Sequence, residues 1–344
     1  MNAFLILLVL FFGLSVIWQI IRIFELTSIL QDKVILSELP SEQTNNFNGT
    51  LLFIGTFFYL GAFVYLFFTY RDKLLPPSAS EHGFSIDALF GTTIVIISIV
   101  FFLTHILLAF FVYKYYGKHG RKAYFYHDNS RLEFFWTLIP TVVLSGLILY
   151  GLIIWDRVMN PSDSNAMHIE IYAKQFQWYA RYPGADSAIG IAGYQHIAGT
   201  NALGLDTNDR KGWDDVITGD LHLPVNRPVL LTFRSQDVIH SAYLPHFRMQ
   251  MNCVPGMTTR FQFTPQTTTT EMRLKENNPD FDFILLCNKI CGAAHYNMKM
   301  PVVVEEESLF KKWIDSQAPF MAGRSSQVKN QSAELNVLPT APVN

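Results

Sequence analysis

Cysteine and charge are both scarce in this chain. Only three cysteines, Cys253, Cys287 and Cys291, occur in 344 residues, so at most one intramolecular disulfide can form and a disulfide-stapled scaffold is excluded. Charged residues make up 16% of the sequence and the formal net charge is −2, which argues against nucleic acid as a partner. The sequence also lacks a Cys-x-x-Cys-His segment, which excludes a covalently attached c-type haem.

Long apolar runs are abundant, by contrast, and they are concentrated in the first 155 positions. A helix needs about 20 consecutive apolar residues to cross the hydrocarbon core of a bilayer. Four runs have this length, and we expect about four transmembrane helices, at 3–24, 50–70, 88–113 and 133–155. The first run has no basic segment before it and is longer than the apolar part of a signal peptide, so we expect it to be retained.

The loop between the third and fourth runs fixes the predicted orientation. It contains one acid, Asp128, and the basic residues Lys114, Lys118, Arg121, Lys122 and Arg131. Because basic loops stay in the cytoplasm, this loop is expected there. Everything after Trp155 is then expected on the outer side of the membrane.

Three residues in these runs are unusual for a membrane helix. Glu133 opens the fourth run; a boundary acid is either a functional group or a partner of the helix dipole, and the residue pattern alone favours the dipole. His105, in the middle of the third run, is expected to form a hydrogen bond within the helix bundle rather than to relay protons. Pro140 is expected to kink or break the fourth helix.

The part of the chain from about 165 to 310 has a different pattern. Short segments of alternating apolar and polar residues, separated by turn residues, occur at 167–173, 228–233, 259–263, 283–286 and 301–304. This alternation predicts an antiparallel sandwich or barrel, and the fold class is therefore a membrane-anchored all-β protein. An acid-rich stretch at 183–220 is interpreted as solvated surface loops, with docking of a basic partner as the alternative.

The densest group of metal-binding side chains follows the segment 283–286. Cys287 and Cys291 are four residues apart, His295 lies four further on, and Met298 three beyond that. Thiolate, imidazole and thioether together favour copper, whereas a structural zinc site usually has four Cys or His ligands and no use for methionine. The loop therefore predicts a copper site more strongly than a zinc site.

One loop cannot easily surround a metal, so a further ligand is expected from a neighbouring segment. His240 is the best candidate, and Asp237 could fix a hydrogen bond beside it. Two thiolates in so short a loop can bridge two metal ions. A dinuclear copper site would use Cys287 and Cys291 as bridges, His240 and His295 as terminal ligands, Met298 on one ion and a backbone carbonyl near Lys289 on the other.

The alternative for Cys287 and Cys291 is a plain disulfide or a redox-active dithiol. The spacing of His295 and Met298 makes this the weaker interpretation. Cys253 stands apart from the group and is expected to be a small buried core residue.

At this point the residues resemble subunit II of cytochrome c oxidase, from the haem-copper oxygen reductases. The resemblance covers about 87–310: a membrane hairpin, Glu133–Pro140, the aromatic run 175–179, Asp237–His240 and the two-cysteine loop. It implies a cupredoxin-like Greek-key β-sandwich that holds the dinuclear copper centre CuA. The implied ligands are His240, Cys287, Cys291, His295, Met298 and the main-chain oxygen of Lys289.

The resemblance also implies a function. The centre would accept electrons from cytochrome c, or from a cytochrome c domain, and pass them to haem a of subunit I. This transfer supports the reduction of oxygen to water, coupled to proton pumping, within a complex of several oxidase subunits. The long N-terminal region resembles a bacterial variant, so we expect a multi-pass protein of the bacterial inner membrane with the copper domain on the periplasmic side.

The sequence is therefore predicted to contain four domains. They are an extra N-terminal region with two spans (1–80), the helical hairpin of the family (81–160), the copper domain (161–319) and a polar tail (320–344).

Three positions bear on how closely this chain follows the family pattern. In the aromatic run, the residue expected to receive electrons is either Phe176, where the family usually has tryptophan, or Trp178. Lys289 stands where many members have a glutamate that reaches a second metal, and an ammonium group cannot bind one. Glu133 matches the family's acid at the mouth of a proton channel, and this match favours a functional role for it.

Two rival functions share parts of the pattern. A quinol oxidase subunit of the same fold would lack copper, and the retained Cys287, Cys291, His240 and Met298 argue against it. A copper chaperone or thiol oxidoreductase would have a thioredoxin-like α/β pattern, which the strand-rich outer half does not show.

Overall fold

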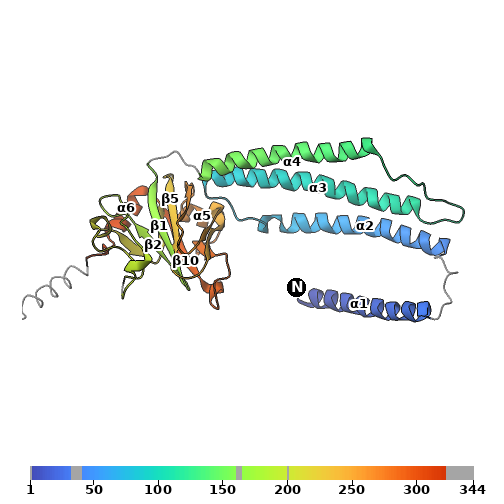
Figure 1. Ribbon diagram of the computed structural model, residues 1–344, viewed down its shortest axis with the longest axis horizontal. Helices are drawn as coiled ribbons and strands as arrows, with labels where there is room; N and C mark the ends of the chain where they lie inside the picture. The colour runs from blue at the N-terminus through green and yellow to red at the C-terminus, as the bar shows by residue number, and fades with distance from the viewer. Residues whose placement is uncertain (1, 32–40, 160–164, 200, 323–344) are drawn as a thin grey trace, which may run out of the picture. The chain divides into compact units, whose positions relative to one another are not determined.

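The computed structural model describes residues 2–31, 41–159, 165–199 and 201–322 (Figure 1). The chain divides into two compact units. One contains the residues up to Thr69 together with Ile97–Asp128, and the other contains Tyr70–Ile96 together with the chain from Asn129 onward. Most of the predicted tail 320–344 lies outside the described residues.

The first unit is helical. It contains α1 (Asn2–Gln31), most of α2 (Glu42–Tyr70) and the second half of α3 (Glu81–Tyr115). Aromatic rings pack α2 against α3: the ring centroids of Phe53 and Tyr113 are 4.9 Å apart, and those of Tyr59 and His105 are 5.8 Å apart. The hydrogen bond predicted for His105 is made with its own helix, between Nδ1 and the carbonyl oxygen of Phe101 at 2.8 Å.

Three helical segments are long and apolar enough to cross a membrane: Glu42–Lys73, Glu81–Tyr115 and Ser130–Met159. They contain the predicted runs 50–70, 88–113 and 133–155. The first predicted run forms part of α1 but is not among these three, so a fourth span stays a prediction. Pro140 does not interrupt α4 (Ser130–Met159), which is continuous through it, as membrane helices often are around proline.

The second unit contains two five-stranded sheets. In spatial order the first sheet consists of β3 (Val216–Thr218), β2 (Gln177–Tyr182), β1 (Met167–Lys174), β5 (Val229–Ser235) and β8 (Thr259–Phe263). The second consists of β4 (Leu221–Pro224), β10 (Lys299–Glu305), β9 (Phe283–Cys287), β6 (His240–Leu244) and β7 (Met249–Cys253). Large side chains from both sheets share one core, among them Phe233 and Phe283, both fully buried.

The alternating pattern predicted antiparallel sheets, and this prediction is wrong for two of the strand pairs. β1 pairs with β5 in parallel, and β4 pairs with β10 in parallel. Alternation of apolar and polar residues reports which side chains face the core, and it is the same for both strand directions. Besides α4 and the first part of α3, this unit contains two short helices. They are α5 (Thr269–Lys275), which begins with a capping box formed by Thr268 and Glu271, and α6 (Glu307–Asp315).

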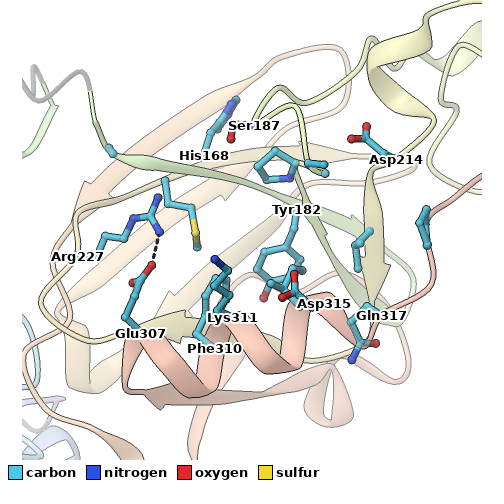
Figure 2. A pocket seen from close by; sticks show the side chains of 18 of the residues that line it. His168, Tyr182, Ser187, Asp214, Arg227, Glu307, Phe310, Lys311, Asp315 and Gln317 are labelled. Atoms are coloured by element: carbon cyan, nitrogen blue, oxygen red, sulfur yellow. Dashed lines mark hydrogen bonds and ion pairs between the residues drawn. The ribbon is translucent and has the colours of Figure 1, made fainter.

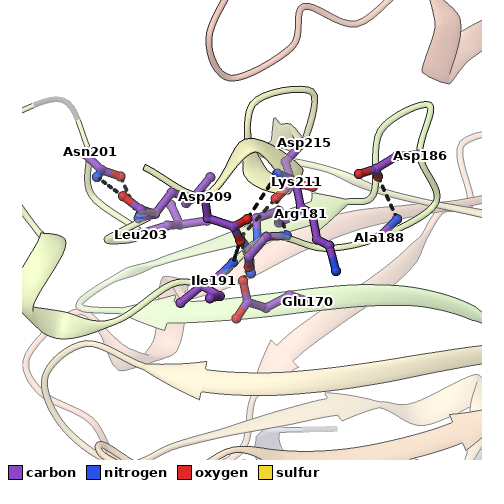
Figure 3. A network of polar contacts seen from close by, with 12 residues as sticks. Glu170, Arg181, Asp186, Ala188, Ile191, Asn201, Leu203, Asp209, Lys211 and Asp215 are labelled. Carbon is purple, nitrogen blue, oxygen red and sulfur yellow. Dashed lines mark hydrogen bonds and ion pairs between the residues drawn. The ribbon is translucent and has the colours of Figure 1, made fainter. Parts of the chain in front are cut away.

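The segment between β2 and β3 covers part of the first sheet and is anchored by buried charges (Figure 3). Arg181 lies 2.5 Å from a carboxylate oxygen of Glu170 and 3.1 Å from one of Asp215, and all three side chains are buried. Arg234 forms a second ion pair with Glu170. Each charge therefore has a partner of opposite sign, as burial of charge requires.

The interpretation of the whole stretch 183–220 as a solvated acidic surface is therefore wrong at Asp215. This residue is fully buried, and its burial raises the pKa of its carboxyl group to about 6. Asp209 is also structural, because its carboxylate accepts the N–H groups of Ile191 at 2.7 Å and Lys211 at 3.2 Å. These acids hold the loop backbone, and an acid-rich sequence does not by itself distinguish that role from solvation.

Candidate metal centre

The two-cysteine loop connects β9 to β10, and the sheet brings β6 beside it. Cys287 is the last residue of β9 and lies opposite Ala242 of the antiparallel strand β6. His240 begins β6, two residues before Ala242, so its ring lies close to the sulfur of Cys287. The loop then folds back through a short helical turn at His295–Asn297, which delivers Met298 to the start of β10.

Six potential donors converge at this point. The sulfurs of Cys287 and Cys291 are 3.7 Å apart. Around Cys287 lie His240 Nδ1 at 3.8 Å and the carbonyl oxygen of Lys289 at 3.3 Å. Around Cys291 lie His295 Nδ1 at 3.6 Å and the sulfur of Met298 at 3.7 Å.

These distances fit a metal centre and do not fit a disulfide. A disulfide requires a sulfur–sulfur distance of about 2.05 Å, so Cys287 and Cys291 are free thiols. Donors that share one tetrahedral ion at about 2.0 to 2.3 Å lie about 3.3 to 3.8 Å from one another. His240, Cys287 and Cys291 in particular each place one donor atom within 4.8 Å of the others.

Burial raises the thiol pKa of both Cys291, which lies in the candidate centre, and Cys253, which lies in the core. Burial, followed by the neighbouring Cys287 sulfur, raises the pKa of the Cys291 thiol to about 11. Binding of a metal to this thiol must therefore displace a proton. Cys253 is fully buried, as predicted, and burial raises the pKa of its thiol to about 12, so it is a packing residue of the core.

Asp237 links the centre to the turn between β1 and β2. Its Oδ1 lies 2.9 Å from His240 Nε2, and its Oδ2 accepts the N–H of Gln175 at 2.7 Å. Burial opposes ionisation of Asp237, but the hydrogen bonds from Gln175, His240 and Val238 lower its pKa overall. The ionised carboxylate fixes which His240 nitrogen faces the sulfur of Cys287.

Two further contacts around the centre were not predicted. The side-chain amide of Gln175 donates to the carbonyl oxygen of Cys291 at 2.6 Å. The indole N–H of Trp178 donates to the carbonyl oxygen of Met298 at 3.5 Å. Both connect residues more than 100 positions apart, so spacing along the sequence gave no signal for them. The proximity of Gln175 to Phe176 in the aromatic run was the only available indication.

Phe176 and Trp178, the two predicted electron-accepting residues, occupy different positions. Trp178 is 1% exposed, and its ring lies edge-on to His240 with the centroids 6.0 Å apart. Phe176 is 36% exposed and lies against Gly292, where a Cβ would come within 2.8 Å of the phenyl ring. The φ of Gly292 is +138°, so glycine both relieves the backbone and leaves room for the ring.

Glu133 is not brought to this centre. It lies exposed in the first turn of α4, where a carboxylate complements the helix dipole, in a shallow open groove with Ser130 and Thr137. A separate pocket of 680 Å³ between β1 and α6 contains none of the predicted ligands (Figure 2). On its wall Arg227 is already paired with Glu307 at 2.8 Å.

Comparison with known proteins identifies the family of both the membrane part and the β-sheet part of the chain. The transmembrane domain of cytochrome C oxidase subunit II matches residues 64–154, and the periplasmic domain of that subunit matches residues 167–307. The alternative cytochrome c oxidase subunit 2 of Bradyrhizobium diazoefficiens is 35% identical over 269 residues, which are 77% of this chain and 92% of that protein. Cytochrome c oxidase subunit 2 of Thermostichus vulcanus is 28% identical over 267 residues, 70% of this chain and 77% of that protein.

Among solved structures, the crystal structure of the periplasmic domain of subunit II of cytochrome oxidase from Bradyrhizobium japonicum matches with 21% identity and a TM-score of 0.31. The match covers 45% of this chain and 94% of that one. On the domain matches and the identity to the Bradyrhizobium diazoefficiens protein, the chain belongs to the cytochrome c oxidase subunit II family, as a subunit of the oxidase complex with membrane helices and a periplasmic β-sheet domain.

Proposed function

We propose that this subunit transfers electrons through a dinuclear copper centre of the CuA type. The observation that carries the proposal is the pair of free sulfurs of Cys287 and Cys291, 3.7 Å apart, each with its own imidazole nitrogen at 3.6 to 3.8 Å. Two thiolates would bridge two ions, and each ion would have one terminal imidazole. Copper, bound in this way, supplies one-electron redox chemistry.

The remaining donors complete the two sites unequally. The carbonyl oxygen of Lys289 lies on the side of Cys287, and the thioether of Met298 on the side of Cys291. The side chain of Lys289 is exposed, so only its main chain takes part, and we propose no second metal at this residue. Soft sulfur donors on both sides favour copper over zinc.

The chain's own residues keep the donors in place. Asp237 orients His240, Gln175 holds the carbonyl group of Cys291, and Trp178 fills the space between His240 and the backbone of Met298. Strands β6, β9 and β10 supply the ends from which the ligands project. A scaffold of this rigidity would limit how far the donors move when the charge of the centre changes.

Electrons would enter from cytochrome c, or from a cytochrome c domain, at Phe176. This residue is partly exposed and lies against Gly292, the neighbour of Cys291, whereas Trp178 is buried. We therefore propose Phe176 as the electron-accepting residue and Trp178 as a packing residue of the centre. The acceptor would be haem a of subunit I, and the transfer would support oxygen reduction coupled to proton pumping.

Three finer assignments belong to the same proposal. The β-sheet domain, within 161–319, would be a cupredoxin-like Greek-key sandwich, and 81–160 would be the family's helical hairpin. Residues 1–80 would add two spans, for four in all. Glu133 would lie at the entrance of a proton channel, which its exposed position at the first turn of α4 allows.

The rival functions are less well supported by the same observations. A subunit without copper has no use for free thiols between two imidazoles. A thioredoxin-like oxidoreductase would have helices between successive parallel strands, whereas this domain consists of two sheets with mainly antiparallel pairs.

Metal analysis of the assembled oxidase tests the proposal. We expect copper in this subunit at two ions per chain, and we expect Cys287→Ser and Cys291→Ser each to remove most of it. Cys253→Ser is the matched control, because Cys253 is buried in the core, and it should retain both ions. Full copper content in both ligand variants would refute the assignment.

A further inference from the structure

The segment that joins α3 to α4 is basic, aromatic and irregular. Residues 116–129 form neither helix nor strand. We define residues 114–128 as the basic aromatic segment. It contains the exposed cations Lys114, Lys118, Arg121 and Lys122. Its one acid, Asp128, lies 3.0 Å from a ring nitrogen of His127.

The four cations of this segment have no acidic partner among the described residues. The guanidinium group of Arg121 donates to the carbonyl oxygen of Lys114 at 2.8 Å, and the ammonium group of Lys118 lies 4.6 Å from the centroid of the Tyr116 ring. The nearby carboxylate of Glu42 accepts the backbone N–H of His119 at 3.1 Å. The positive charge is therefore available to an external anion.

Three consecutive aromatic side chains of the segment are directed into solvent. The exposed fractions are 91% for Tyr124, 87% for Phe125 and 64% for Tyr126. Their ring contacts are with neighbours in the same segment: Tyr124 with Tyr126 at 6.3 Å between centroids, and Phe125 with His127 at 5.2 Å. Three large aromatic side chains this exposed in one short segment point to an interaction site.

The chain topology puts this segment at the cytoplasmic surface of the membrane. The β-sheet domain is periplasmic, and α3 begins at Glu81, next to Ser80, which bridges to Pro265 of that domain. A helix that crosses the bilayer from there ends on the cytoplasmic side, and α3 ends at Tyr115. The segment thus lies where apolar helix gives way to water, the level at which aromatic side chains concentrate.

We propose that the basic aromatic segment binds anionic phospholipid headgroups of the cytoplasmic leaflet. Lys114, Lys118, Arg121 and Lys122 would contact the phosphates, and Tyr124, Phe125 and Tyr126 would lie at the level of the headgroups. That leaflet is negatively charged, which complements the unpaired cations. A lipid fits better than free phosphate, because exposed aromatic rings need an apolar phase beside the anion. This inference does not depend on the copper centre.

Native mass spectrometry of the full chain in detergent tests the proposal, with phosphatidylglycerol and phosphatidylcholine as probes. The wild-type chain should prefer phosphatidylglycerol. Lys118→Gln/Lys122→Gln should lower that affinity about thirtyfold, as expected for two cations near an anionic surface, and should leave phosphatidylcholine binding unchanged. Tyr124→Ser/Phe125→Ser should weaken the binding of both lipids, and inorganic phosphate should compete no better than chloride at equal ionic strength.

The matched control is Lys311→Gln/Lys312→Gln, which removes two exposed cations from α6 in the periplasmic domain. It should leave both lipid affinities unchanged. An equal loss in both charge variants would overturn the proposal. The proposal would also fail if Lys118→Gln/Lys122→Gln kept its preference for phosphatidylglycerol but bound less catalytic subunit in the assembled oxidase, since the segment would then be a protein interface.

Discussion

Met298 is the residue at which the proposed copper centre can be adjusted without removing it. Its side chain is buried, with the thioether 3.7 Å from the sulfur of Cys291. Leucine has a similar volume, so Met298→Leu should cost less than about 1.5 kcal/mol of stability. A thioether donates electron density to oxidised copper and an alkyl group does not, so the variant should have a higher midpoint potential and slower transfer. Redox titration measures this, and an unchanged potential would mean that Met298 is not a ligand.

His246 gives the β-sheet domain a measurable pH dependence. Burial, with a further contribution from the charge of Arg248, lowers the pKa of His246 from 6.5 to about 4, and its ring lies against Phe281 and Phe283. The unfolded chain then binds a proton between pH 6.5 and 4 that the folded chain does not bind, so stability falls as pH decreases through this range.

His246→Phe should make that loss of stability smaller, because phenylalanine cannot take up the proton. Thermal unfolding of the full chain in detergent, followed by tryptophan fluorescence at pH 5 and pH 7.5, measures the difference. If the variant and the wild type lose the same stability between these two pH values, His246 does not titrate as described.

The residues of the centre could be predicted from the sequence to different degrees. Cys287, Cys291, His295 and Met298 are close together in one loop, so their convergence required no knowledge of the fold. His240 is 47 residues from Cys287, and its proximity depends on the pairing of β6 with β9. The contacts of Gln175 and Trp178 arise from tertiary packing that no local pattern encodes.

The difference in exposure between Phe176 and Trp178 could not be predicted from the sequence either. Two residues that are two apart in a strand face the same side, so alternation would place both in the core. β2 begins only at Gln177, however, and Phe176 belongs to the turn before it. That turn directs Phe176 to the surface.

Among the elements, the segment between β2 and β3 depends on a close contact of two glycines. A Cβ on Gly190 would come within 2.3 Å of the Cα of Gly212, so the backbone would have to move. Gly190→Ala should destabilise the segment by about 1 to 3 kcal/mol, as overpacking usually does. Limited proteolysis between residues 183 and 215 should be faster in this variant.

Gly219→Ala is the control for this experiment, because a Cβ there meets no atom within 4 Å. It should change stability by less than about 0.5 kcal/mol. Equal proteolysis of the two variants would contradict the close contact of Gly190 with Gly212.

The elements were predictable only in part. Apolar run length identified the segments that form α2, α3 and α4, and alternation identified β1, β5, β8, β9 and β10. Alternation did not identify β6, which begins at His240. Strand order and the two parallel pairs were not predictable, because they depend on how the chain crosses between sheets. The burial of Asp215 was also hidden, since it depends on Arg181 from β2.

For the whole molecule, the proposed copper centre and the proposed lipid site use different parts of the chain. The periplasmic domain holds the free thiols and their imidazole neighbours, and the segment between α3 and α4 holds cations that have no acidic partner among the described residues. Because the two sites share no residue, lipid binding and copper binding should be separable. Lys118→Gln/Lys122→Gln should therefore retain its full copper content.

The central claim is that the two thiolates bind two copper ions that behave as one redox unit. Electron paramagnetic resonance of the full chain loaded with copper tests this most directly, because the hyperfine pattern reports how many copper nuclei share the unpaired electron. We predict one unpaired electron shared equally by two copper nuclei. The hyperfine pattern of a single copper nucleus, or a protein whose Cys287 and Cys291 are joined as a disulfide without copper, would contradict it.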